Sequence, residues 1–156
     1  MTVAINARSL RNAFGQFATG VTVVTSRHGD KTRGMTANSF SSVSLDPPML
    51  LVCIANTAHM MTLIEKSGVF ALSVLESGQQ SVSEYFAGSG NARHVAFAEF
   101  EGMPVIEGAL ALFNCRVEAS YPAGDHTILV GEITACEHRS GAPLLFHSGA
   151  YADLRR

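Results

Sequence analysis

The sequence lacks the short motifs that mark the commonest cofactor and catalytic sites. It has no Gly-x-Gly-x-x-Gly after a predicted strand, no phosphate loop ending in Gly-Lys-Ser/Thr, and no Gly-x-Ser-x-Gly. A Rossmann cofactor site and a serine-hydrolase nucleophile elbow therefore have no support. It also has no Cys-x-x-Cys and no His-x-x-x-His pair, so no metal site is predicted.

Excess charge and long apolar runs are missing as well. The 156 residues include 11 basic and 13 acidic side chains, for a net charge of -2, which argues against a general nucleic-acid binder because such proteins carry a basic face. No window is apolar for long enough to span a membrane, and residues 1–10 lack the apolar core of a signal peptide. The three widely spaced cysteines, Cys53, Cys115 and Cys136, suggest reduced thiols. We expect a cytoplasmic protein that binds neither nucleic acid nor membrane.

What the chain does contain is a succession of strand patterns, with hydrophobic residues making up 47% of the sequence. Strands are predicted at 21–25, 49–54, 69–75, 109–121, 127–137 and 144–147, with a last segment at 150–154 and two more within 34–44. Helices are predicted at about 6–18, 58–66 and 77–86, the second capped by Asn56 or Thr57. Residues 94–107 have no regular pattern, and residues 122–126 predict a wide loop between two long strands.

This order predicts one domain over residues 1–156 that is mainly β. The strands have no regular helical crossovers between them, so a doubly wound parallel sheet is unsupported. An antiparallel barrel with short peripheral helices fits the pattern better.

The stretch from Gly34 to Ser44, Gly-Met-Thr-Ala-Asn-Ser-Phe-Ser-Ser-Val-Ser, is the first candidate for a binding site. Composition alone favours a half-exposed strand and turn. However, Ser and Asn form strands poorly, and here they are concentrated between good strand formers. Hydroxyls and main-chain N–H groups bind phosphate without net positive charge, and the Asn38 amide offers both a donor and an acceptor to a heterocycle. Both interpretations remain open at this point.

Two further residues have a simple structural interpretation beside a functional one, and two more have a structural interpretation alone. His126, in Gly-Asp-His, is an ordinary loop histidine or a group that contacts a bound carbonyl or ring. Arg93 is a solvated surface residue or a phosphate ligand. Cys53 is most simply a small buried hydrophobe, and Tyr151 a packing residue or hydrogen-bonded surface residue.

Five motifs in the same order resemble the flavin reductase-like domain family, the short reductases that supply reduced flavin to two-component monooxygenases. The first two are Phe-Ala-Thr-Gly-Val-Thr-Val-Val-Thr at 17–25 and Gly-Met-Thr-Ala-Asn-Ser-Phe at 34–40 with Ser-Val-Ser-Leu-Asp-Pro-Pro at 42–48. The third is Phe-Ala-Leu-Ser-Val-Leu at 70–75, and the fourth is Gly-Asp-His at 124–126 with Val-Gly-Glu-Ile at 130–133. The last is Pro-Leu-Leu-Phe at 143–146 with Gly-Ala-Tyr at 149–151, so the resemblance covers almost the whole chain.

The resemblance implies a split β-barrel that binds FMN or FAD and works as a homodimer. It implies a nicotinamide-side role for His126, shared by Tyr151. The implied cofactor-binding residues are Met35, Thr36, Ala37, Asn38, Ser39, Ser42, Val43, Ser44, Cys53, Ile54, Asn56, Arg93 and Tyr151.

The activity that the resemblance implies is NAD(P)H:flavin oxidoreductase, with NADH or NADPH as co-substrate and an oxygenase component receiving the reduced flavin. The alternative is a flavin-binding or flavin-carrier protein without an efficient nicotinamide site. A third possibility is a flavoenzyme that acts on an organic substrate of its own.

Overall fold

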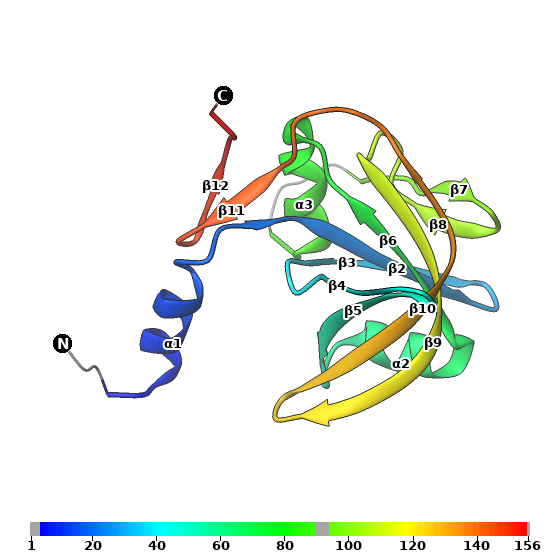
Figure 1. Cartoon of the computed structure of the whole chain (residues 1–156), viewed down its shortest axis with the longest axis horizontal. Helices are drawn as coiled ribbons and strands as arrows, with labels where there is room; N and C mark the ends of the chain where they lie inside the picture. The colour runs from blue at the N-terminus through cyan, green and yellow to red at the C-terminus, as the bar shows by residue number, and fades with distance from the viewer. Residues whose placement is uncertain (1–3, 90–93, 156) are drawn as a thin grey trace.

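The computed structural model describes residues 4–89 and 94–155, in which β-strands predominate (Figure 1). The elements in chain order are α1 (Ala7–Phe14), β1 (Thr19–Gly20), β2 (Thr22–His28), β3 (Lys31–Ala37), β4 (Ser41–Leu45), β5 (Pro48–Ala55), α2 (His59–Ser67), β6 (Val69–Val74), a short 3₁₀ helix η1 (Ser77–Gln79), α3 (Gln80–Phe86), β7 (Ala98–Phe100), β8 (Met103–Val105), β9 (Ala111–Ala123), β10 (His126–His138), β11 (Leu145–His147) and β12 (Ala150–Ala152). The prediction of a mainly β fold with short helices in the connections is confirmed.

Seven of these strands form one sheet in the order β3-β2-β6-β9-β10-β5-β4, and every neighbouring pair is antiparallel. The two edge strands, β3 and β4, are consecutive in sequence and are separated only by residues 38–40. Such a short connection between opposite edges requires the sheet to curl into a barrel, and β3 does contact β5 across the opening. The barrel is therefore split between β3 and the β4–β5 pair.

The core follows from the alternation of side chains along the strands. In β5, Leu50, Val52 and Ile54 are buried and alternate with half-buried neighbours. Both faces of β2 are covered: Val24 packs in the main cluster beneath α2, whereas Val23 packs in a second cluster on the opposite face of the sheet.

The helices begin and end where local chemistry permits. Asn6 caps α1, accepting from the Ser9 amide at 2.9 Å. Gly68 ends α2 with φ of 71° in the left-handed region. The predicted cap of α2 was wrong: Ala58 occupies that position without a side-chain hydrogen bond. Asn56 is not available for it because its side chain is bonded to the β9–β10 turn and to Thr127.

Two other expectations were also wrong. The wide loop at 122–126 is a two-residue turn of Gly124 and Asp125, because β9 continues through Pro122 and Ala123 and Gly124 adopts a φ of 65°. The irregular segment after His94 contains the small antiparallel hairpin of β7 and β8. Among the described residues, no helix has the length and apolar character required to cross a membrane.

Candidate active site

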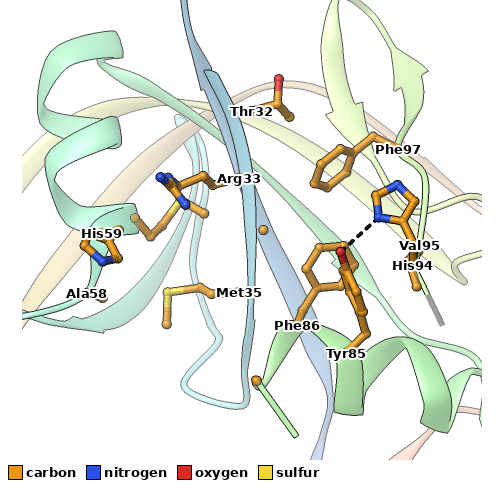
Figure 2. A pocket seen from close by; sticks show the side chains of 13 residues that line it. Thr32, Arg33, Met35, Ala58, His59, Tyr85, Phe86, His94, Val95 and Phe97 are labelled. Atoms are coloured by element: carbon orange, nitrogen blue, oxygen red, sulfur yellow. Dashed lines mark hydrogen bonds between the residues drawn. The ribbon is translucent and has the colours of Figure 1, made fainter. Parts of the chain in front are cut away.

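A cleft of about 610 Å³ lies along the edge strand β3 (Figure 2). Figure 2 shows Arg33, Met35 and His59 on one side of this cleft, facing Tyr85, His94 and Phe97 on the other. The walls come from β3, the start of α2, the end of α3 and the segment before β7. The volume falls within the range of about 300–1,000 Å³ usual for small-molecule sites.

The floor of the cleft is an open strand edge. In the described part of the chain β3 pairs only with β2, so its other edge has main-chain N–H and C=O groups without strand partners. Gly34 lies in the middle of this segment, and a Cβ there would stand 2.7 Å from two ring carbons of Phe86. The absence of a side chain at this position therefore lets the Phe86 ring lie against the strand.

One end of the cleft is suited to an anion. Arg33 and His59 are exposed side chains there, and Arg33 makes no ion pair within the described residues. The first turn of α2 lies at the same end, and its cap residue Ala58 gives it no side-chain acceptor. The first-turn N–H groups and the helix dipole both favour negative charge at this point.

The opposite wall is largely aromatic. Phe86 and Phe97 lie with ring centroids 5.5 Å apart, and Tyr85 packs edge-on against both Phe86 and His94. The Tyr85 hydroxyl is 3.0 Å from His94 Nδ1, which fixes the two side chains relative to each other. A planar ring system would find an apolar surface here and a hydrogen-bonding edge at β3.

Of the residues predicted to bind a cofactor, Met35 lines this cleft directly. Its neighbour Thr36 donates to the Ser83 carbonyl of α3 at 2.6 Å, and Ala37 packs against the main core. Asn38 lines a second cavity, of about 340 Å³, together with Phe17. The predicted segment therefore borders two separate cavities.

Ser39 and Cys53 are brought together across the split of the barrel. The Ser39 hydroxyl donates to the Cys53 carbonyl at 2.9 Å and accepts from the Cys53 amide at 3.1 Å. These bonds fix the connection between β3 and β4 onto β5. Ile54, the next residue along, is fully buried in the core, so only its main chain is accessible to a ligand.

Tyr151 reaches the same region from the C-terminal hairpin. Its hydroxyl lies 2.7 Å from the Ser83 hydroxyl, and Ser83 is fully buried on α3. Because Thr36 bonds to the Ser83 carbonyl, the three residues form a brace between β3, α3 and β12.

His126 and Asn56 both lie at the β9–β10 turn, and neither is among the residues that line the main cleft. His126 lies opposite Ala55 in the register with β5, and its Nδ1 is 2.7 Å from the Asp125 carboxylate. This contact holds the pKa of Asp125 below its usual value. Asn56 donates to the Gly124 carbonyl at 3.2 Å and accepts from the Thr127 hydroxyl at 2.7 Å, which stabilises the turn.

The remaining predicted residues lie elsewhere. Ser42, Val43 and Ser44 are on the other edge strand, β4, where a register shift between Ser42 and Ser44 leaves Val43 exposed. Arg93 lies outside the described residues. Within the described part of the chain, no three His, Cys, Asp or Glu side chains are close enough to hold a metal ion.

Sequence reasoning missed most of the cleft wall. Arg33 directly precedes the stretch singled out above, and His59 is the first residue of a helix that was predicted. A cation beside a candidate binding segment and a histidine at a predicted helix start were therefore available signals. Tyr85, Phe86 and Phe97 gave no such signal, because their approach to β3 depends on the packing of α3 and of the segment before β7.

The donor set fits a flavin nucleotide. The open main-chain edge at β3 matches a heterocycle whose rim alternates donors and acceptors, the aromatic wall matches its ring, and the cationic end matches a phosphate. The chain itself supplies every one of these features.

Comparison with known proteins agrees with this fit. The model of the flavin reductase like domain matches residues 14–155. The FMN reductase (NADH) SmoA of Agrobacterium fabrum is 46% identical over 153 residues, which cover 97% of this chain and 88% of that protein. The reductase component of 4-hydroxyphenylacetate 3-monooxygenase from Thermus thermophilus is 40% identical over 147 residues, covering 94% of this chain and 95% of that protein.

A solved structure extends the likeness to three dimensions. The flavin reductase PheA2 in its native state superposes with a TM-score of 0.94 at 43% identity, covering 97% of this chain and 100% of that one. The split-barrel expectation is thereby confirmed, and the chain belongs to the flavin reductase-like domain family.

Proposed function

We propose that this protein is an NAD(P)H:flavin oxidoreductase that acts as a single domain and binds FMN or FAD in the cleft along β3. The observation that carries the proposal is the cleft itself, with an open strand edge, an aromatic wall and a cationic end around about 610 Å³. Its relatives, among them an FMN reductase that uses NADH, support both the activity and NADH as the co-substrate.

The reacting groups belong to the two nucleotides: the nicotinamide supplies a hydride and the flavin ring accepts it. The protein's part is to bind and orient them, because hydride transfer requires the two rings in contact. Arg33, His59 and the first turn of α2 would hold the phosphate. Main-chain groups at the edge of β3 would hold the polar rim of the flavin, and the wall containing Phe86 and Phe97 would exclude water from one side.

His126 is assigned to the nicotinamide side. Asp125 accepts a hydrogen bond from Nδ1–H, which leaves Nε2 as an acceptor in the neutral ring. An acceptor of this kind suits the carboxamide NH₂ of a nicotinamide. Asn56 keeps the turn that bears His126 attached to the end of β5.

A homodimer is the assembly we propose. α1 buries none of its residues, and Phe14 and Phe17 are 72% and 79% exposed. In Figure 1 this helix projects from the barrel beside β11 and β12. The second cavity opens next to Phe17 and contains Thr19, whose hydroxyl is buried and has no partner in the described residues. A second copy would cover this apolar surface.

The reduced flavin then passes to an oxygenase component, a role supported by the Thermus thermophilus relative, which is the reductase component of a monooxygenase. We place the protein in the cytoplasm, where its three free cysteines would remain reduced. Burial raises the pKa of the Cys115 thiol to about 12, so that thiol stays protonated in any case.

The activity is tested by mixing the purified protein with a nicotinamide and a flavin under air and following the nicotinamide absorption band. We expect NADH to be oxidised when FMN or FAD is present, and not when flavin is omitted. Failure with both nicotinamides and both flavins would overturn the proposal. Tight retention of flavin through gel filtration without NADH oxidation would instead indicate a flavin-carrier protein.

A further inference from the structure

A further cleft, of about 310 Å³ and called the groove below, adjoins the anion-binding end of the proposed flavin cleft. The two clefts share Arg33 and His59, which line both of them. The groove runs between the outer side of α2 and the turn that joins β2 to β3. The two cavities therefore meet at these two side chains, and a ligand with an anionic group at Arg33 and His59 lies next to both.

Strand β3 and helix α2 both place positively charged side chains in the groove. Lys31 and Arg33 alternate along β3 and so share a face, and His59 and Lys66 lie on one face of α2, two helical turns apart. The lining contains three fixed cations, Lys31, Arg33 and Lys66, and a single carboxylate, Asp30. The whole chain, by contrast, has 11 basic and 13 acidic residues.

These cations are not used elsewhere in the described structure. The ion pairs there join Arg27 to Glu99, Arg116 to Glu132 and His126 to Asp125, and none includes Lys31, Arg33 or Lys66. Lys31 and Lys66 are both exposed. The groove therefore carries a net positive charge and adjoins the proposed flavin cleft.

We infer that this groove binds the adenylate half of FAD, so that the protein binds the dinucleotide flavin more tightly than FMN. This inference rests on the proposed function. FMN ends at its phosphate, whereas in FAD that phosphate is linked through a second phosphate to adenosine. With the first phosphate at Arg33 and His59, the second phosphate and the adenosine enter the groove, where Lys31 and Lys66 supply positive charge.

The test compares the affinities of the two flavins by the quenching of flavin fluorescence at equilibrium. The variant is the double substitution Lys31→Gln and Lys66→Gln, which removes two exposed charges that lie outside the proposed flavin cleft. We expect the wild type to bind FAD more tightly than FMN. In the variant, FAD affinity should fall by about threefold to tenfold, as expected for two partly screened charge contacts, and FMN affinity should change by less than about twofold. Arg116→Gln is the matched control, since it removes a positive charge on β9 and should leave both affinities unchanged.

Three results would overturn the inference. They are an equal loss of FMN and FAD affinity, no loss of either, and a raised KM for NADH with both flavin affinities intact, which would assign the groove to the nicotinamide nucleotide. If the wild type binds and reduces FMN but the variant shows no FAD-selective loss, this inference falls and the proposed function stands. If the wild type binds neither flavin, both fall.

Discussion

Ser39 and Cys53 are joined by two hydrogen bonds through a single hydroxyl group, which donates to the Cys53 carbonyl and accepts from the Cys53 amide. A serine side chain thus stands where a neighbouring strand would otherwise pair with β5. The bond lies at the split of the barrel, where β3 and β4 separate. It fixes the connection between the two edge strands, and with it the position of the β3 edge that borders the cleft.

Replacing Ser39 with Ala should therefore destabilise the fold. Loss of both bonds leaves the Cys53 amide without its partner, and we expect the free energy of unfolding in urea to fall by about 1–3 kcal/mol. Ser41→Ala is the matched control, because Ser41 is exposed and, among the described residues, its hydroxyl bonds only to the adjacent Ser42 carbonyl. It should change stability by less than about 0.5 kcal/mol. Equal effects of the two substitutions would contradict this role for Ser39.

The Arg33 guanidinium should bind the phosphate group of the flavin nucleotide. Arg33→Gln removes a charge-assisted contact, and we expect about a tenfold loss of FMN affinity. Riboflavin, which lacks the phosphate, is the internal control and should bind the variant and the wild type equally. A comparable loss of riboflavin affinity would show that Arg33 contacts the ring or supports the cleft instead.

His126→Ala should slow flavin reduction without weakening flavin binding. If the imidazole orients the nicotinamide, its loss misplaces the hydride donor, and we expect a fall in kcat/KM for NADH of about tenfold to hundredfold. The dissociation constant of FMN, measured by fluorescence, should not change. Weaker flavin binding with unchanged reduction of bound flavin would refute the assignment.

The contact between Asp125 and His126 also has a pH signature. The hydrogen bond from His126 holds the pKa of Asp125 below the ordinary value of 3.8, so the contribution of the pair to stability is present above pH 3.8 and is lost as the pH falls through the lower folded-state pKa. An NMR titration of the Asp125 carboxyl should show this depressed pKa, and His126→Ala should return it towards 3.8. An unchanged value in the variant would place the cause elsewhere.

How far the sequence alone predicts this structure depends on whether the signal is local. The alternation along β5 and the β-branched run of β2 identify core strands because each residue's environment follows from its own position. The hairpin of β7 and β8 was missed because its strands have only three residues each and one contains Pro104. The turn at Gly124 was predicted in the right place, but the predicted loop of residues 122–126 is too long because Pro122 and Ala123 remain in β9.

The site shows the same division. The hydroxyl-rich segment was visible in the sequence because it departs from strand propensity. The partners of this segment were not visible in the sequence. Ser39 bonds to Cys53, and Thr36 to Ser83, only because the sheet curls and α3 packs against it. Arg33 and His59 each had a local signal in the sequence, but their proximity to each other depends on how α2 lies against β3.

The proposed dimer should depend on the apolar side chains of α1. Phe14→Asp places a charge on the surface that a second copy would cover, and we expect sedimentation to show a shift from dimer to monomer. Thr62→Asp, which introduces the same charge at an exposed position on α2, should leave the dimer intact. A wild type that sediments as a monomer at all concentrations would exclude the assembly.

The exposure of α1 has one further consequence. The helix has eight residues, buries none of them, and depends on the Asn6 cap and its own main-chain bonds. Isolated helices shorter than about 12–15 residues are marginal in water. The order of α1 should therefore depend on protein concentration: its amides should exchange with solvent rapidly in dilute solution and slowly where copies associate. Hydrogen exchange at this one helix would then report on association, while the barrel amides remain protected throughout.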